Sequence, residues 1–246
     1  MPNALATAAV SMQNDMRYMQ TVAQNMANIA TPGYKRAIPV AQAFDAALMA
    51  AAPGPQQATP GAVPELPQPP VSSVPDLSAG AVKQTGRLWD LAITGDGYFE
   101  LATPEGPAYT RAGDFRLDGQ GRLVSQHGYP VQGLDGPLQL NGSAAVAIGH
   151  DGRITQDGAA VGQIKLVRFA DTRALHKNGA GLLQGAEGTP DPRPELQSGY
   201  LENSNVSPLR EMVAMMETTR RFEAAQKLYQ GYDEALGSAI QKLGQF

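Results

Sequence analysis

The side chains that could do chemistry in this chain are its three histidines and the aspartates that adjoin its turns. His127, His150 and His176 lie in separate stretches, and their spacing matches no metal-ligand pattern. The candidate acids are Asp114, Asp118, Asp151 and Asp157. A glycan hydrolase would need two of them, such as Asp114 and Asp118, to converge in a cleft. Aspartates beside turns normally accept local backbone hydrogen bonds, so the sequence favours a structural role for all of them.

Other catalytic and cofactor-binding patterns are incomplete or absent. Gly95-Asp96-Gly97 resembles the start of a phosphate-binding loop, but it lacks a third glycine and lies between two β-prone runs. No Gly-x-Ser-x-Gly motif occurs, and the absence of cysteine excludes disulfides, thiolate metal sites and a cysteine nucleophile. We therefore expect a protein that is not an enzyme and that uses no cofactor, metal or small-molecule substrate.

Charge and hydropathy narrow the class of partner. The net charge is −4, and residues 37–207 hold eleven basic and seventeen acidic side chains. No block of Lys or Arg is dense enough to bind a phosphate backbone, so we expect no nucleic acid partner. No apolar run approaches the roughly 18 residues of a membrane span, and the N-terminus lacks a secretory signal pattern. We expect no membrane insertion, and any export to proceed without a cleaved signal peptide.

The first long element is a helix predicted over residues 3–30. Its apolar residues recur at alternating spacings of three and four: Leu5, Ala8, Met12, Met19, Val22, Met26 and Ile29. Asp15 and Arg17 are its only charged residues, so the usual charged outer face is missing. Thr31-Pro32-Gly33 ends the helix, because proline cannot continue the backbone ladder. Such a helix is adapted to being surrounded by protein, although a core helix of a single domain stays an alternative.

The second long element is a helix predicted from Pro208 to about residue 243. Ser207 can cap it, and proline at the first helical position loses no hydrogen bond. One apolar stripe comprises Met215, Phe222, Ala225, Tyr229, Tyr232, Leu236, Ala239 and Leu243. A second apolar patch comprises Leu209, Met212, Val213 and Met216. Two terminal helices with heptad stripes are predicted to pair with each other, and their remaining faces to be covered by helices from other copies.

The centre of the chain is predicted to be β-structure that follows a proline-rich spacer. Residues 53–75 contain eight prolines, which favour an extended linker of polyproline character. From Gly80 onward, short β-prone runs alternate with turn signals such as Asp118-Gly119, which is typical of hairpins. The alternation in Gln163–Phe169 predicts one strand with an apolar face and a basic face.

These elements predict an α+β fold. The long N- and C-terminal helices are expected to pair as a coiled-coil-like domain, and the central region to form an all-β, hairpin-rich domain. The expected boundaries are residues 1–36 for the N-terminal helix, 37–79 for an Ala/Pro-rich linker, 80–202 for the β-domain and 203–246 for the C-terminal helix.

Three motifs in order resemble those of the bacterial flagellar rod and hook family. Residues 23–36 read Ala-Gln-Asn-Met-Ala-Asn-Ile-Ala-Thr-Pro-Gly-Tyr-Lys-Arg, which is similar to the family pattern A-x-N-[LM]-A-N-x-x-T-P-G-[FY]-[KR]. Residues 201–206 read Leu-Glu-Asn-Ser-Asn-Val and are followed by Glu211-Met212-Val213, which resembles the C-terminal motif. Between them, residues 95–99, 109–111 and 128–131 match the pattern of the central domain.

The resemblance implies a non-catalytic rod subunit that self-assembles through its terminal helices into an axial tube and transmits torque to the hook. It implies export through the flagellar type III apparatus, a place in the periplasmic rod of the basal body, and partners that are copies of the chain and other rod proteins. The run Thr219–Glu223 is most similar to a proximal rod member. A distal rod or hook-type protein of the same family is one alternative, and a secreted β-rich binding module dimerised by a terminal coiled coil is another.

The residues expected to pack between subunits lie on the apolar and neutral faces of both helices. They are Leu5, Met12, Met19, Val22, Asn25, Met26, Asn28, Ile29, Met212, Val213, Met216, Phe222, Tyr229, Tyr232, Leu236 and Leu243. Asn25 and Asn28 belong to the set as neutral polar groups that bond within a packed wall; a polar helix face is the alternative.

Overall fold

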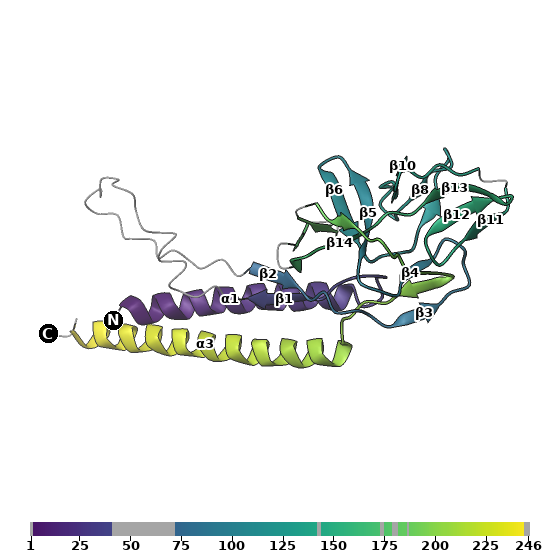
Figure 1. Cartoon of the computed structure of the whole chain (residues 1–246). Helices are drawn as coiled ribbons and strands as arrows, with labels where there is room; N and C mark the ends of the chain where they lie inside the picture. The colour runs from purple at the N-terminus through teal and green to yellow at the C-terminus, as the bar shows by residue number, and fades with distance from the viewer. Residues whose placement is uncertain are drawn as a thin grey trace, which may run out of the picture. The chain divides into compact units, whose positions relative to one another are not determined.

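The computed structural model describes residues 2–40, 72–141, 144–172, 175–178, 182–185 and 187–243 (Figure 1). Most of the predicted proline-rich linker, together with the Ala-rich stretch before it, lies outside the described residues. The described chain divides into two compact units. The first contains residues 2–26, 37–40, 72–73 and 208–243, and the second contains residues 27–36 and 74–207. The predicted boundaries of the linker and the terminal domains stay a prediction.

Two long helices lie in the first unit. Helix α1 spans Pro2–Ala27 and ends three residues earlier than predicted, before the Thr31-Pro32-Gly33 turn. Helix α3 spans Pro208–Leu243, which confirms the start and the end that the sequence predicts. Glu211 in the first turn of α3 complements the positive end of the helix dipole. Neither helix in the described part of the chain is long and apolar enough to cross a membrane.

The prediction that the two helices pair as a coiled-coil-like domain is wrong. The helices run antiparallel where they touch, and polar groups meet there: Asn25 donates to Glu211 at 3.1 Å, and Arg221 lies 3.8 Å from Asp15. A coiled coil buries an apolar residue at each a and d position, whereas Tyr229 of the predicted stripe is 42% exposed. The physical reason is that polar residues interrupt both stripes at the contact, namely Asp15 on α1 and Glu211 and Thr218 on α3.

The rest of the described chain is rich in strands. Their bounds are β1 (Ala37–Val40), β2 (Ser72–Pro75), β3 (Val82–Gln84), β4 (Leu91–Ile93), β5 (Tyr98–Thr103), β6 (Gly106–Thr110), β7 (Arg116–Leu117), β8 (Leu123–Val124), β9 (Gln132–Gly133), β10 (Gly136–Pro137), β11 (Val146–Ile148), β12 (Arg153–Gln156), β13 (Ala159–Gln163), β14 (Leu166–Arg168), β15 (His176–Lys177), β16 (Leu183–Gln184), β17 (Thr189–Pro190), β18 (Leu196–Ser198) and β19 (Tyr200–Glu202).

A six-stranded sheet with the order β15-β16-β6-β5-β14-β17 is the largest described, and β11-β12-β13 form a second sheet. Strand β19 pairs with β3 and β18 pairs with β4, so the end of the second unit returns to its beginning. The single strand predicted for Gln163–Phe169 is divided. Strand β13 ends at Gln163, Ile164 bridges Gly133, and β14 begins at Leu166.

The core of the second unit consists of two groups of apolar side chains. The larger group includes Leu91, Phe99, Leu101, Leu123 and Ile154, all completely buried, with the Phe99 ring edge-on to Phe115. The smaller group surrounds Tyr109 and Val167. Trp89, the single tryptophan of the chain, packs against the larger group, so its fluorescence reports on the folding of this unit.

Candidate functional site

The three family-like motifs, which are far apart in the sequence, meet at one place in the second unit. We call residues 27–36 the signature turn. Gly33 donates its backbone N–H to the carbonyl of Glu202 at 2.7 Å, and Arg36 donates its N–H to the side-chain oxygen of Asn205 at 2.7 Å. Gly33 also lies against the backbone of Arg111 and Ala112, where a Cβ atom would come within 2.1 Å of the Ala112 nitrogen. The signature turn is therefore packed and hydrogen-bonded within the second unit.

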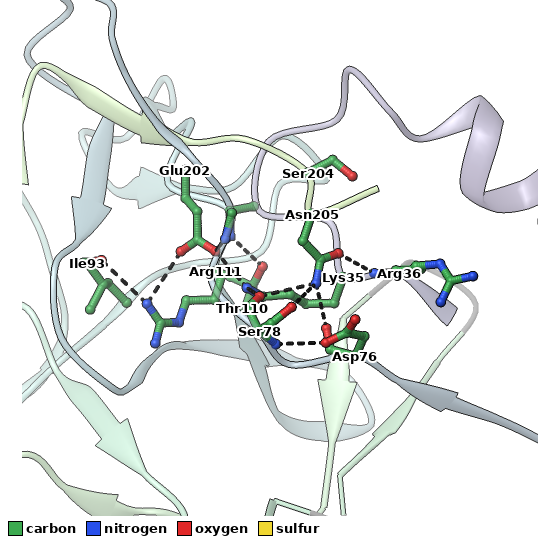
Figure 2. Close-up of polar contacts among 12 residues, drawn as sticks. Lys35, Arg36, Asp76, Ser78, Ile93, Thr110, Arg111, Glu202, Ser204 and Asn205 are labelled. Carbon is green, nitrogen blue, oxygen red and sulfur yellow. Dashed lines mark hydrogen bonds and ion pairs between the residues drawn. The ribbon is translucent and has the colours of Figure 1, made fainter. Parts of the chain in front are cut away.

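A buried charge cluster of Lys35, Arg111 and Glu202 lies at the centre of this junction (Figure 2). The Lys35 Nζ is 2.6 Å from one Glu202 oxygen, and the Arg111 Nη1 is 3.4 Å from the other. The side chains of Lys35 and Glu202 are only 3% and 1% exposed. Burial lowers the pKa of Lys35, and the hydrogen bond to Glu202 opposes that shift. An interior ion pair depends on its full set of hydrogen bonds, because neither charge can be solvated.

The remaining polar atoms of the cluster are bonded mostly to backbone. Lys35 also donates to the carbonyl of Ser78 at 2.7 Å, and Glu202 accepts from the N–H of Gly80 at 2.9 Å. Arg111 donates to the carbonyl of Gly95 at 2.9 Å, while its Nε is buried without a partner. These bonds join the signature turn to strands from both ends of the second unit.

Asn205 makes a second set of ties beside the charge cluster. Its amide nitrogen donates to the carbonyls of Asp76 and Ser78 at 2.9 and 3.1 Å, while its oxygen accepts from Arg36 (Figure 2). The N–H of Asp76 donates to the Arg36 carbonyl at 2.7 Å. One amide side chain thus joins three segments, a role that an aliphatic side chain could not fill.

In the first unit, Asn25 holds the end of α1. Its side chain exchanges two hydrogen bonds with the backbone of Ala37, at 2.8 and 2.9 Å, and also donates to Glu211. Both Asn25 and Glu211 are completely buried. Asn28 lies in the signature turn, where the hydroxyl of Thr31 donates to its side-chain oxygen at 3.1 Å.

The predicted packing residues differ in how far their side chains are exposed to solvent. Besides Asn25, Val22 is buried, whereas the exposed members are Met212, Val213, Met216 and Tyr229. The half-buried members are Met12, Met19, Met26, Asn28, Ile29, Phe222 and Tyr232. The side chains of Leu5, Leu236 and Leu243 lie outside the described part. The sequence reasoning missed the buried charge cluster, although each of its members lies inside one of the three motifs and could have been singled out as a charged motif residue.

The candidate catalytic residues do not form a site. No group of His, Asp and Glu that could hold a metal ion occurs among the described residues. The Nδ1 of His150 is 3.0 Å from the carbonyl of Leu196, and His127 lies beside the ring of Tyr129. Asp118 accepts hydrogen bonds from the N–H groups of Gln120 and Arg122, both at 2.9 Å. Asp118 therefore has the turn role that its sequence context predicts.

Asp114 and Asp118 are expected to respond oppositely to loss of charge. Burial, aided by nearby Asp90, raises the pKa of Asp114, whereas backbone hydrogen bonding from Arg122 lowers the pKa of Asp118. As pH rises from about 3.8 through the raised folded pKa of Asp114, this carboxyl increasingly destabilises the folded state. Asp118 has the opposite effect: it contributes its full stabilisation above pH 3.8 and loses that contribution as pH falls through its lowered folded pKa. At pH 7, Asp114→Asn should raise the free energy of unfolding, by less than about 1 kcal/mol. Asp118→Asn should lower the free energy of unfolding at the same pH.

Trp89 fluorescence during urea unfolding measures both effects in the same unit. Each substitution serves as the control for the other, because both replace a carboxylate beside a turn by an amide of equal size. A fall in stability for Asp114→Asn would contradict the assignment of that carboxylate as a destabilising charge.

The chain is similar in sequence to known proteins and matches two protein-family models. The family model "Flagellar basal body rod FlgEFG protein C-terminal" matches residues 197–242, and "Flagellar hook protein FlgE/F/G D1 domain" matches residues 92–156. The chain is 36% identical over 173 residues to the flagellar basal-body rod protein FlgF of Rhizobium meliloti, covering 67% of this chain and 71% of that protein. It is 32% identical over 250 residues to FlgF of Caulobacter vibrioides, covering 99% of both. It is also 38% identical over 183 residues to the rod protein FlgG of Bacillus subtilis, covering 66% of this chain and 68% of that protein.

Proposed function

The chain belongs to the flagellar basal-body rod protein family, and we propose that it is incorporated into the rod by burying an exposed apolar patch of α3 against neighbouring subunits. It is a structural subunit of the bacterial flagellar basal body, similar to FlgF, and its family assembles with other rod components. The proposal concerns which surface makes those contacts.

The observation that carries the proposal is the exposure of apolar side chains at the start of α3. Leu209, Met212, Val213 and Met216 are 69%, 45%, 41% and 56% exposed. Their spacing of three and four places them along one side of the helix. A contiguous exposed apolar surface is typical of a protein interface, and a subunit of a homopolymer presents the same surface in every copy.

The proposal includes further contact surfaces besides this patch. Tyr229 is exposed on another side of α3, and half-buried Met12 and Met19 lie on α1. In the polymer these faces are completed by neighbouring chains, whereas Val22 and Asn25 serve mainly to fix α1 within its own chain. Subunits packed around a ring resist twisting, because rotation must separate many close contacts at once. That property suits a drive shaft that transmits torque to the hook.

The finer assignment is a proximal rod subunit that is exported through the flagellar type III apparatus and has no catalytic activity. Support for the proximal position comes from full-length FlgF relatives, which match over 99% of both chains at 30% and 32% identity. A distal rod position is the second candidate, because FlgG of Bacillus subtilis is 38% identical over 183 residues. Deleting the gene and complementing it separately with flgF or flgG from one relative distinguishes the two positions.

Met216→Asp is expected to block incorporation into the rod while leaving the chain folded. Its side chain is 56% exposed in the isolated subunit, so a carboxylate there is solvated until a neighbour covers it. Burying that charge without a partner costs several kcal/mol, which should reduce incorporation on the order of a hundredfold. The measurement is the amount of the chain in purified basal bodies, together with swimming in soft agar.

Gln226→Asp is the matched control, because Gln226 is an exposed polar residue on the same helix. This variant should be incorporated and support normal swimming. Normal swimming by cells that carry only Met216→Asp would show that the patch is not a subunit contact. A loss of helical far-UV circular dichroism or of solubility in that variant would instead indicate a folding defect, and Met212→Asp then provides the second test.

A further inference from the structure

The methionines of the chain are concentrated on its two long helices. The sequence contains nine methionines, and residues 27–36 and 74–207, which make up the second unit, contain none. Those in the described part of the chain are Met12, Met16, Met19 and Met26 on α1 and Met212, Met215 and Met216 on α3. Because the chain has no cysteine, methionine carries all of its sulfur, and oxidation at sulfur can occur only there.

The methionine side chains differ in exposure, and two of the exposed ones belong to the apolar patch of α3. Met212 and Met216 are 45% and 56% exposed, and Met16 on α1 is 44% exposed. Met19 is half-buried instead, and its sulfur accepts a hydrogen bond from the hydroxyl of Thr219 at 3.8 Å. A small oxidant in solution can therefore approach the two patch methionines of the free subunit more readily than it can approach Met19.

We infer that Met212 and Met216 make incorporation into the rod sensitive to peroxides, because their oxidation to the sulfoxide opposes burial of the apolar patch. The inference rests on the subunit contact proposed above. A lone pair of the thioether sulfur attacks one oxygen of the peroxide, the O–O bond breaks, and an S=O bond forms. The second oxygen takes up the proton of the first and leaves as water or an alcohol. Sulfur loses two electrons and the peroxide gains them, so no further reactant is required.

Oxidation changes the property of these side chains on which the contact depends. A thioether is apolar and flexible, so it packs against neighbouring surfaces of varied shape. A sulfoxide carries a polar oxygen, which is hydrated in the free subunit and loses that water when a neighbour covers it. Leu209 and Val213, the other members of the patch, have no side-chain donor that could bond to this oxygen. Each sulfoxide should therefore reduce incorporation roughly tenfold.

The first experiment measures the chemical step. The purified full chain is treated with hydrogen peroxide, and sulfoxide formation at each methionine is followed by peptide mass spectrometry. Met212 and Met216 should oxidise several-fold faster than Met19, and this difference should disappear in concentrated urea. Oxidation of the native chain at equal rates, or more slowly at Met212 and Met216, would overturn the inference.

The second experiment measures incorporation in cells that carry only the altered chain. In Met216→Gln a polar amide takes the place of the sulfoxide, whereas Met216→Leu stays apolar and has no sulfur. Purified basal bodies should contain roughly tenfold less of the Gln variant than of the Leu variant. Far-UV circular dichroism checks the helical fold of both, and Met212→Gln with Met212→Leu provides a second pair.

A third experiment supplies hydrogen peroxide during flagellar growth and compares incorporation with and without it. Peroxide should lower incorporation of the native chain and have much less effect on the double variant Met212→Leu/Met216→Leu. Met16→Leu should remain as sensitive as the native chain. Protection by Met16→Leu, or full sensitivity of the double variant, would contradict the assignment to Met212 and Met216.

The failure of this inference differs from the failure of the proposed contact. If Met216→Asp is excluded from the rod while Met216→Gln enters as well as Met216→Leu, the patch is a contact but a sulfoxide does not block it. If Met216→Asp also enters the rod, the contact itself is refuted, and the inference with it.

Discussion

Glu202→Gln is expected to destabilise the second unit by about 3–5 kcal/mol, because it leaves Lys35 and Arg111 as buried charges without a counter-charge. The glutamine has nearly the same shape, so the change removes the charge and leaves no cavity. The amide also replaces one of the two accepting oxygens by an N–H₂ group, which then faces either Arg111 or both Lys35 and the Gly80 N–H. The loss should appear as a lower urea midpoint in Trp89 fluorescence, with little change in slope.

Glu100→Gln is the matched control for this prediction. Glu100 also pairs with a lysine, at 2.9 Å, but the side chains of Lys165 and Glu100 are 26% and 14% exposed. Water can solvate Lys165 when its partner is removed, so the expected loss is below about 1 kcal/mol. Similar losses in the two variants would mean that the buried charge cluster has no special role in stability.

Gly33→Ala is expected to be equally damaging, for a steric reason. Gly33 has φ of +63°, and its Cβ would lie 2.1 Å from the Ala112 nitrogen and 2.3 Å from the Arg111 carbonyl carbon. Both contacts are with backbone, which cannot move aside as a flexible side chain can. The left-handed conformation alone costs about 1–2 kcal/mol for alanine, and the displacement of the signature turn should raise the total to about 4 kcal/mol. Trp89 fluorescence in urea measures this loss as well.

Gly86→Ala separates the two contributions. Gly86 has φ of +73°, but a Cβ there would meet nothing within 4 Å. It should therefore lose only the conformational contribution of about 1–2 kcal/mol. If Gly33→Ala were no more harmful than Gly86→Ala, the close approach between the signature turn and the Arg111–Ala112 backbone would not constrain the fold.

The structure shows which features a sequence can predict here and which it cannot. The sequence predicts the start of α3, because Ser207 and Pro208 act on the backbone within one turn. The buried charge cluster was not predicted, because Lys35 and Glu202 are 167 residues apart and Arg111 and Glu202 are 91 apart. Nothing in the local pattern states that these charges pair.

The wrong coiled-coil prediction has a related cause. A stripe of apolar residues specifies which side of a helix is apolar, but it does not specify which surface covers that side. Glu211 and Thr218 occupy positions within the apolar stripe of α3 and are buried there, and Glu211 accepts a hydrogen bond from Asn25 of α1. Likewise, the alternation in Gln163–Phe169 is continuous in the sequence, yet Ile164 turns to a different partner from Leu166.

The second unit consists of residues 27–36 together with residues 74–207, and this composition has a kinetic consequence. When the chain emerges from a ribosome or a narrow channel with its N-terminus first, the signature turn appears early but its partner Glu202 appears 167 residues later. The closing contacts are thus among the most non-local in the chain, and non-local contacts form slowly. The unit can be completed only after more than four-fifths of the chain has emerged, since Asn205 lies near the end of 246 residues. The second unit therefore closes late, after most of the chain has emerged.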